Sequence, residues 1–585
     1  MEDQKNFLAA IALSTLVLIG YWYFVGRPMN EQAREQVRLE QEGAASAPRT
    51  PQVVLQPRDT VINSAQRIKI DTPSLSGSFR VRGSRFDDIK LKNYRQTLDR
   101  DSPNVIVSTP EGVEKAAYSF DNWVRGEGSG TETAWALVSG NTLTPDNPVV
   151  LQYEGEGFAV ERTITVDDRY LITLADRVSN TGNTEISLVR RGASRQHGLP
   201  DDLTNFFILQ EGPISIIDNR LFDRKYKSVV KKRIVEERGL SGWVGLTDKY
   251  WLMAAIAPQQ RPMTVNFAYR NINDQEIYEA TYALDPVTLT PGAAIESVGY
   301  VFAGAKDRDV LSSYEKNLGI AQMERAIDWG FLRILTRPMS WALSKMGAFF
   351  GNYGIAIMAL TLIIKILLFP LFNKQYEMQA KMKKVQPKLK KIQGLYKDDP
   401  TRLRQEMMGL YRKENVNPAA GCLPIIPTII IFFALYKTVF INVELRHAPF
   451  FGYIQDLSAR DPLSVLNGFG LLPWTGVPEN LLGFFAIGPL AFLYGATMAA
   501  MYLLTPPPST GGEMAEIQAK IFKFMPWIFM FVLAPFAAGL LIYWVWNNVL
   551  SFAQQYYITR KFNVDTPFDA FFRRLRGKGE KAANG

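Results

Sequence analysis

Long apolar runs in the last 240 or so residues constrain this chain more than any other feature. A helix of about 20 apolar residues is long enough to cross the hydrocarbon core of a bilayer. Five such spans are predicted at 348–373, 421–442, 481–504 and, as two helices, 521–556. The last range is too long for one crossing. Its Ala534-Pro535 step, near the middle, predicts a tight hairpin of two helices.

The N-terminus contains one more apolar run, from Phe7 to Val25, without a charged residue. Its far end is aromatic, and no small-residue cleavage site follows directly. We therefore expect an uncleaved transmembrane anchor over 1–28, with a cleaved signal peptide as the alternative. Residues 29–57 are rich in Gln, Glu, Arg, Ala and Pro, which predicts a flexible linker.

Residues 58–318 alternate between apolar and polar positions with the period of two that is typical of strands. The clearest apolar faces are Phe158, Val160, Ile164 and Val166, and Met263, Val265, Phe267 and Tyr269. Many short strands joined by turns predict an antiparallel β-sandwich. The run 242–251 interleaves Gly, aromatic and charged residues. It fits a ligand surface, although packing and turn formation explain it more simply.

Charge assigns the two sides of the membrane. The segment 374–420 carries twelve Lys and Arg residues, whereas 443–480 carries only Arg446 and Arg460, and the tail 557–585 is again basic. Because basic loops remain on the cytoplasmic side, 374–420 and the tail are expected there, and the order of the spans places the loop 505–520 on the same side. The β domain and the loop 443–480 are then periplasmic. Six spans also place both termini in the cytoplasm.

The basic segment 374–420 has the pattern of a helical hairpin. One arm has apolar residues spaced four, three, four and three apart, at Met378, Met382, Val385, Leu389 and Ile392, and Leu403, Met407 and Leu410 continue on the return arm. This spacing predicts a coiled-coil seam with arms of about 20 residues, bent or interrupted at Pro387. The adaptable methionines can also receive apolar segments of a partner, or the seam only closes the hairpin.

An amphipathic helix is predicted over 319–347. Its apolar stripe consists of Ile320, Met323, Ile327, Phe331, Ile334 and Leu335. Since a membrane span follows directly, we expect this helix to lie along the outer interface. A helix packed on the β domain is the alternative.

Lys365 lies inside the apolar span 348–373. A charge there costs about 2.5–3.5 kcal/mol on insertion scales. No carboxylate occurs in the other spans, so an ion pair within the spans is excluded. Two explanations remain: a water-filled groove open to the cytoplasm, or a side chain that reaches the interface. The polar residues that could line such a groove are Thr361, Thr428, Tyr436, Tyr494, Thr497, Tyr543, Asn547 and Asn548.

Several classes of function are disfavoured. The chain has no phosphate-binding loop, nucleophile elbow or HExxH motif, its two histidines are far apart, and its single Cys422 excludes an internal disulfide. We expect no enzymatic activity, metal, cofactor or small-molecule substrate, and no sequence-specific nucleic-acid recognition. A solute transporter with a periplasmic accessory domain is the main alternative, although intramembrane acidic residues and internal repeats are missing. A mutarotase-like envelope enzyme would require activity in the β domain.

Motifs along the whole chain resemble the YidC family of membrane protein insertases. They are Gly242-Trp243, Thr247-Asp248-Lys249-Tyr250, Gln386-Pro387, Gln405-Glu406-Met407-Met408, Asn417-Pro418, Gly421-Cys422, Ala434-Leu435-Tyr436, Val443-Glu444-Leu445-Arg446 and Asp461-Pro462. The resemblance implies a periplasmic β supersandwich, a signal-anchor helix and a core of five transmembrane helices around a positive hydrophilic groove. It implies insertion, folding and assembly of inner-membrane proteins, alone or with the Sec translocon. Nascent membrane proteins, the ribosome and anionic lipids are the implied partners.

The resemblance also implies roles for single residues. Lys365 occupies the place of the groove charge, which is usually an arginine in the family. Thr361 and Trp544 match substrate-contacting positions, with Tyr543 beside Trp544. Thr428 replaces a frequent glutamine, which leaves the polarity of that wall open. In the hairpin, Met378, Met382, Gln386, Pro387, Met407 and Met408 are the implied functional residues.

Overall fold

The structure, a computed structural model, describes residues 55–99, 101–126, 128, 130–201, 203–204, 209–232, 234–272, 274–396, 399–416, 425–472, 485–505, 513–564, 566 and 568–569. The predicted anchor 1–28, nearly all of the linker 29–57, Cys422, part of the loop 505–520 and most of the tail 557–585 lie outside these residues. Residues 57–270 and 276–585 form one compact unit.

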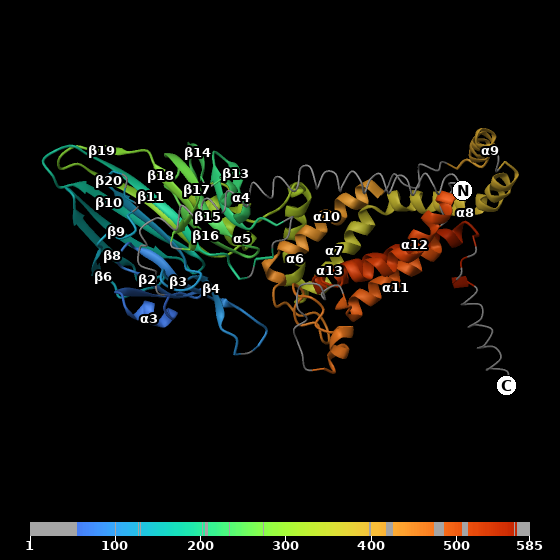
Figure 1. Ribbon diagram of the computed structural model, residues 1–585, viewed down its shortest axis with the longest axis horizontal. Coiled ribbons are helices and arrows are strands. Elements are labelled where there is room, and N and C mark those ends of the chain that lie inside the picture. The colour runs from blue at the N-terminus through green and yellow to red at the C-terminus, as the bar shows by residue number, and fades with distance from the viewer. Residues whose placement is uncertain are drawn as a thin grey trace. The chain divides into compact units, whose positions relative to one another are not determined.

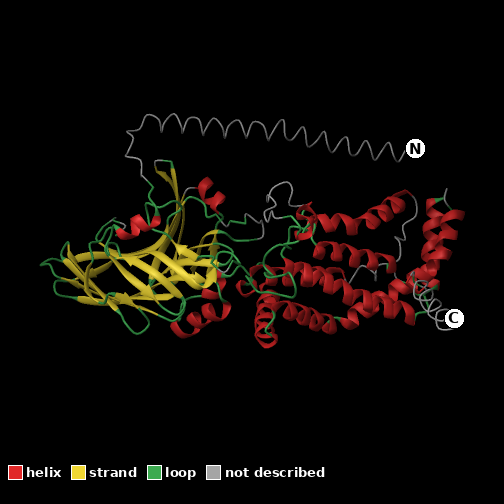
Figure 2. Cartoon of the chain, turned by 90° about the horizontal axis from the view of Figure 1, so that it is seen from below, coloured by secondary structure: helices red, strands yellow, loops and turns green. Residues whose placement is uncertain are grey.

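Strands occupy the chain from Arg67 to Ala305 in two sheets (Figures 1 and 2). The first has the order β14 (Ile234–Leu240), β17 (Pro262–Ile272), β18 (Gln275–Leu284), β11 (Ile186–His197), β5 (Ala117–Val124), β3 (Arg85–Arg95), β2 (Leu75–Arg80), β1 (Arg67–Asp71), β7 (Thr142–Leu143), with β19 (Val287–Leu289) on β11 and β4 (Asn104–Ser108) on β3. The second has the order β13 (Arg220–Asp223), β12 (Gly212–Ile217), β15 (Gly242–Thr247), β16 (Trp251–Ile256), β20 (Ala294–Ala305), β10 (Leu171–Asn180), β9 (Phe158–Val166), β8 (Val149–Gly155), β6 (Ala136–Ser139). Among the pairs whose register is described, only β1 with β7 is parallel. The predicted β-rich domain is confirmed.

Strand β9 shows how the pattern of two becomes a core. Phe158, Val160, Ile164 and Val166 are buried, while Ala159, Glu161, Thr163 and Thr165 are more exposed. The predicted apolar face is therefore correct, but it contains one residue that the apolar pattern passes over. Arg162 points into the same core and is fully buried.

The Arg162 side chain belongs to a buried group of four charges. Arg162 donates two hydrogen bonds of 2.7 Å to the Asp176 carboxylate, and Arg190 Nε donates to Asp121 Oδ1 at 2.8 Å. All four side chains are inaccessible to solvent. Burial opposes the charge on Asp176, but Arg162 and Arg190 keep its pKa below the usual value. Two cations and two anions leave no net charge in the core, which makes their burial tolerable.

Residues 242–251 contribute to the core of the β domain and to the turn between β15 and β16. Trp243 is fully buried in β15 and donates from Nε1 to the Ala321 carbonyl at 3.0 Å. Asp248 Oδ1 closes the turn before β16 by accepting from the backbone N–H groups of Tyr250 and Trp251 at 2.8 and 2.7 Å. Lys306 Nζ donates to Thr247 Oγ1 at 3.0 Å, and burial, opposed by Asp248, lowers the pKa of Lys306 to about 8. Structural duties thus account for the motif.

The described chain also contains eleven α-helices. They are α3 (Arg58–Asn63), α4 (Tyr226–Lys232), α5 (Arg308–Leu318), α6 (Arg333–Phe350), α7 (Tyr353–Leu367), α8 (Phe369–Leu395), α9 (Pro400–Lys413), α10 (Ile425–Ile441), α11 (Pro489–Leu504), α12 (Glu513–Leu533) and α13 (Ala538–Lys561). Helix α11 packs against both α12 and α13, as Figure 1 shows. The break between α12 and α13 lies at the predicted Ala534-Pro535 step.

The prediction of a single amphipathic helix over 319–347 is wrong. A short 3₁₀ turn, Met323–Ala326, and the separate helix α6 replace it. Ile320, Met323 and Ile327 join the core of the β domain, whereas Phe331 and Ile334 are 89% and 88% exposed. The apolar residues have the spacing of one helix, but some lie in the core of the β domain and others are exposed. Periodicity alone does not reveal this difference.

The span predicted over 348–373 is also divided. Gly351, in the left-handed conformation, ends α6, and the Asn352 side chain caps α7 by accepting from Gly354 N and Ile355 N. Pro370 lies in the first turn of α8, where its missing N–H is tolerated but a helix cannot continue through it from α7. The two helices meet at 70°.

By length and composition, none of the described helices could cross a bilayer alone, while α7 and α8 together meet both criteria. Two shorter apolar helices lie at Pro427–Ile441 and Pro489–Leu504.

The buried charges of the sandwich give a first testable prediction. Replacing Arg162 by Met leaves Asp121 and Asp176 with one cation between them, which should cost about 3–5 kcal/mol. The matched control is Arg238→Met, because Arg238 pairs with Asp285 on the surface and should contribute less than about 1 kcal/mol. The urea dependence of proteolysis within 57–305 of the full-length chain measures both. Equal losses would contradict the role assigned to the buried group.

Candidate functional site

Lys365 lies in the last turn of α7, directly before the bend into α8. Its side chain is half-buried, and Nζ donates a hydrogen bond of 2.6 Å to Ser551 Oγ on α13. The same nitrogen lies 4.5 Å from the centre of the Phe372 ring, close enough for a cation–π contact. Among the described residues no carboxylate pairs with it, so the charge is held by a hydroxyl and a ring.

A second lysine within a predicted span, which the sequence pattern did not single out, behaves differently. Lys437 of α10 lies inside the range 421–442, and its Nζ donates to Asp328 Oδ2 at 2.8 Å. Asp328 lies outside every predicted span. Lys437 therefore has an opposite charge beside it, and a third lysine, Lys523 in the range 521–556, is exposed. Among the described lysines of the predicted spans, Lys365 is thus the one that is half-buried without an opposite charge.

A cavity of about 50 Å³ lies beside Lys365. Its lining comes from α7, α8, α10, α13 and the α7–α8 break: Thr361, Ile364, Lys365, Leu368, Phe372, Thr428, Ile431, Phe432, Leu435, Tyr543 and Asn547. Five of the residues predicted from the sequence thus meet at one place. One water needs roughly 10–15 Å³, so the cavity can hold water, although it is far smaller than a wide groove.

Tyr436 and Trp544 lie beside this cavity without lining it. The Phe432 ring stacks on both, at centroid distances of 6.5 Å to Tyr436 and 5.8 Å to Trp544. Both residues are buried, and within the described part of the chain neither Tyr436 Oη nor Trp544 Nε1 has a hydrogen-bond partner. Leaving such a group unsatisfied costs about 1–3 kcal/mol, so a polar group arriving here would be favoured.

Other polar residues considered from the sequence take part in helix packing. Asn548 Nδ2 donates to Thr497 Oγ1 at 3.2 Å and ties α13 to α11. Tyr494 packs its ring on Trp544 at 6.0 Å. These residues are not part of the cavity lining.

Ser551 belongs to this candidate site through its hydrogen bond with Lys365, and it was not predicted from the sequence. A signal for it existed, because Tyr543, Asn547, Ser551 and Gln555 recur every four residues and share one face of α13. Further along this face, Gln555 Nε2 donates to Gln379 Oε1 at 3.0 Å. Beside it, Gln554 Nε2 donates to Asn373 Oδ1 at 2.9 Å. Polar contacts between α8 and α13 thus continue from Lys365 toward the hairpin.

The hairpin consists of α8 and α9. Its core contains Val385, Leu389, Tyr411 and Val416, with Met382, Met407 and Leu410 packed against them. The predicted seam is therefore present, but α9 has 14 residues rather than about 20, and α8 continues through Pro387. Lys397 and Asp398, near the tip, lie outside the described residues.

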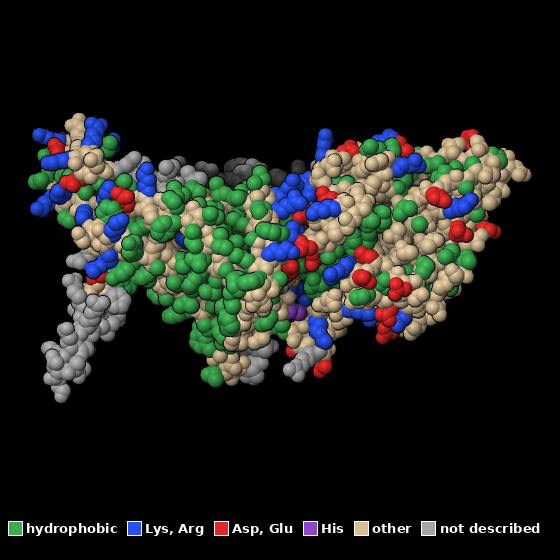
Figure 3. Space-filling view, turned by 180° about the vertical axis from the view of Figure 1, so that it is seen from behind, with side chains coloured by type: hydrophobic (Ala, Val, Ile, Leu, Met, Phe, Trp, Pro, Cys, Tyr) green, Lys and Arg blue, Asp and Glu red, His purple; other side chains and the backbone are tan. Residues whose placement is uncertain are grey.

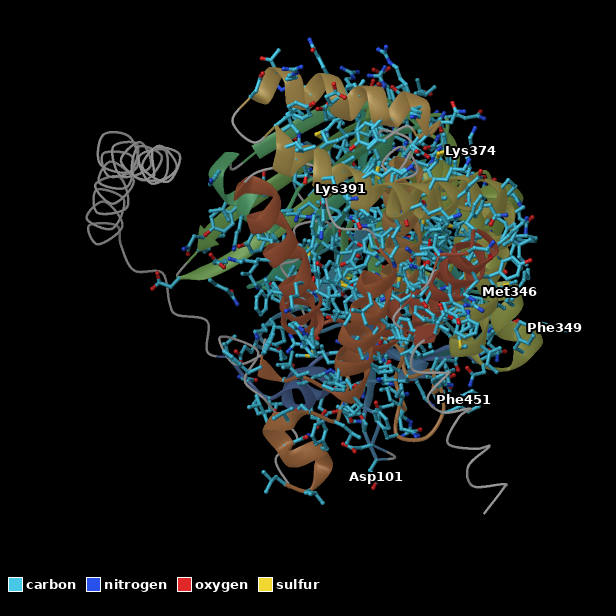
Figure 4. The ribbon with its side chains drawn as sticks, turned by 90° about the vertical axis from the view of Figure 1, so that its right-hand side faces the viewer. Asp101, Met346, Phe349, Lys374, Lys391 and Phe451 are labelled. Atoms are coloured by element: carbon cyan, nitrogen blue, oxygen red, sulfur yellow. The ribbon has the colours of Figure 1, made fainter. Side chains whose placement is uncertain are left out.

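The remaining predicted hairpin residues are not in this core. Met378 and Gln386 are half-buried, Pro387 is exposed and Met408 is 50% exposed. Lys374 and Lys391 are exposed on α8 (Figure 4), in keeping with the basic surface that the sequence predicts.

The hairpin core can be tested with one pair of variants. Leu389→Ala removes a side chain that is 3% exposed and should cost about 2–5 kcal/mol of hairpin stability. Met408→Ala truncates an exposed side chain and should cost less than about 0.5 kcal/mol. Trypsin cleavage rates at the hairpin lysines measure the difference. If both variants were cleaved equally fast, the seam would not hold the hairpin together.

Comparisons with known proteins identify the family of the chain. Residues 67–342 match the family described as YidC periplasmic domain, and residues 345–565 match the family described as 60Kd inner membrane protein. The chain is 41% identical to the membrane protein insertase YidC of Maricaulis maris (strain MCS10), over 99% of this chain and all of that one. It is 38% identical to that of Bradyrhizobium diazoefficiens, over 96% and 97% of the two chains. A crystal structure of an active YidC insertase with its first transmembrane domain resolved aligns over 84% of this chain and 92% of that one, at 17% identity and a TM-score of 0.33. The chain therefore belongs to the YidC family of membrane protein insertases.

Proposed function

We propose that this protein inserts membrane proteins into the bacterial inner membrane, using the cavity between α7, α8, α10 and α13 as a polar, positively charged groove open to the cytoplasm. The observation that carries the proposal is Lys365, whose ammonium group lies at this cavity with a hydroxyl and a ring for partners. A cation in that setting is suited to attract acidic or polar segments of a client protein.

The proposed topology has six spans with both termini in the cytoplasm. The basic segment 374–420 and the basic tail support cytoplasmic placement, whereas the charge-poor loop 443–480 supports a periplasmic one. The β domain is then periplasmic. The divided span at α7–α8 fits a helix that leaves the membrane near Leu368 and continues as the first arm of the hairpin.

Exposed apolar side chains support lateral contact with lipid. On α7 these include Leu362, Ile363, Ile366 and Leu367, of which Leu367 is 74% exposed. Figure 3 shows hydrophobic side chains spread over the helical part on the face seen there. Apolar area of this extent is rare on a protein surrounded by water and is expected where acyl chains cover it.

The proposed mechanism is physical and needs no nucleotide. Lys365 and the neighbouring polar groups lower the cost of bringing a short hydrophilic tail of the client into the membrane. The apolar segment of the client then moves from the protein into lipid, driven by about 25 cal/mol per Å² of apolar surface removed from water. The exposed apolar residues of α7 are neighbours of Lys365 in the sequence. The proposed path of the client from the groove to the lipid is therefore short.

The same proposal includes partners. The basic hairpin surface and tail suit the ribosome and anionic lipid, and the long periplasmic domain suits cooperation with the Sec translocon in folding and assembly of clients. A solute transporter is not favoured, because the relatives at 41% and 38% identity are named as insertases.

The charge at Lys365 provides the direct test. Lys365→Arg should support insertion of a client with an acidic tail into vesicles, because the cation is kept. Lys365→Leu should reduce insertion of this client by about tenfold or more. A tenfold reduction requires the loss of only about 1.4 kcal/mol of attraction. Normal insertion by the Leu variant would refute the role of the charge.

Deletions test where the activity lies. In cells depleted of the native protein, a chain without 58–318 should retain much of its insertion activity, because the proposed groove is built from other helices. A chain without 374–416 should lose activity. The reverse result would place the activity in the β domain and favour an envelope enzyme.

A further inference from the structure

The ammonium group of Lys365 joins residues of three helices. It lies at the end of α7 and donates a hydrogen bond to Ser551 of α13. The Phe372 ring of α8 covers the ammonium group from another side and stacks on Tyr376. Ser551 is 3% exposed, so this junction is buried at the 70° bend between α7 and α8.

The hydrogen bonds fix the orientation of the serine hydroxyl. Ser551 Oγ donates its one proton to the Asn547 carbonyl oxygen at 2.7 Å, one helical turn earlier. A hydroxyl has one proton and two acceptor positions. With the proton committed to the helix backbone, the acceptor positions of the oxygen remain for the ammonium group of Lys365. Ser551 is therefore used only as an acceptor toward the cation.

This arrangement matters because a lysine side chain is flexible. Four methylene groups allow the ammonium group of a lysine to move several ångströms toward water at a membrane surface. Lys365 lies in the last turn of its helix, where that movement is easy. The hydrogen bond of 2.6 Å to Ser551 instead keeps Nζ beside the cavity that Thr361, Asn547 and Tyr543 line.

We propose that Ser551 is the positioning residue that holds the Lys365 ammonium group at the cavity and thereby sets the selectivity of this protein for clients with acidic tails. The inference rests on the proposed function, in which Lys365 attracts such tails. Ser551 acts through Lys365 and need not touch the client. Its contribution should therefore depend on the charge of the client and on the presence of the lysine.

The test uses the purified full-length protein in vesicles of phosphatidylethanolamine and phosphatidylglycerol. Two model clients share one apolar segment and differ only in the tail, which carries Asp and Glu in one and the isosteric Asn and Gln in the other. Ser551→Ala should slow insertion of the acidic client by about tenfold, as expected for the loss of a hydrogen bond to a charged group. Insertion of the neutral client should change by less than about twofold, and Ser551→Thr, which keeps the hydroxyl, should restore selectivity.

Two controls separate positioning from stability. Gln554→Ala removes another side-chain tie between α13 and α8 without touching Lys365, and it should slow both clients equally or neither. Ser551→Ala added to Lys365→Leu should have no further effect on the acidic client. An additional loss in that double variant, or an equal loss for both clients with Ser551→Ala alone, would overturn the inference.

The outcome also separates this inference from the proposal beneath it. If Lys365→Leu inserted the acidic client normally, the proposed role of the charge would fail, and the inference about Ser551 would fail with it. If Lys365→Leu lost selectivity while Ser551→Ala kept it, only the positioning role would be overturned.

Discussion

A lysine ammonium group among aliphatic side chains is the constraint around which the helical part is organised. Such a group must keep hydrogen-bond partners or water, because complete desolvation without an opposite charge costs several kcal/mol. Lys365 obtains one partner from Ser551 and a ring from Phe372, and it lines a cavity whose other polar residues are Thr361, Thr428, Tyr543 and Asn547. The bend after Leu367 makes this possible, because the chain changes direction there and the Phe372 ring of α8 lies 4.5 Å from the ammonium group.

The β domain handles buried charge in the opposite way. Arg162 and Arg190 are as deeply buried as any residue in the protein, but Asp121 and Asp176 neutralise them within hydrogen-bond distance. A group of charges that are all paired fixes the arrangement of the two sheets. It leaves no unpaired charge that could bind a ligand. Lys437, paired with Asp328, follows the same rule. Lys365 departs from it, because no carboxylate among the described residues pairs with its charge.

The sequence predicted those features that depend on local patterns. Alternation identified the buried face of β9, the seven-residue repeat identified the hairpin seam, and Ala534-Pro535 marked the break between α12 and α13. It failed where one pattern served two surroundings. Ile320, Met323 and Ile327 belong to the β core although Phe331 and Ile334 continue the same spacing outside it. In the range 348–373, hydropathy does not show that α6 ends at Gly351 or that Pro370 lies in the first turn of α8.

The pairing of Lys365 with Ser551 shows the limit more sharply, since 186 positions separate the two residues. Half of the contact is visible in the sequence: Tyr543, Asn547 and Ser551 recur every four residues, so they mark one polar face of the last helix. The other half depends on the 70° bend, which decides what α7 and α8 present to that face. Apolar periodicity describes how a helix meets lipid or a core and carries no information on the angle between successive helices. That angle comes from Pro370, a residue whose effect is on the backbone and not on hydropathy. Residues that end or begin a helix therefore constrain the position of a buried cation as strongly as apolar runs do. They determine which polar face of a distant helix the cation can reach.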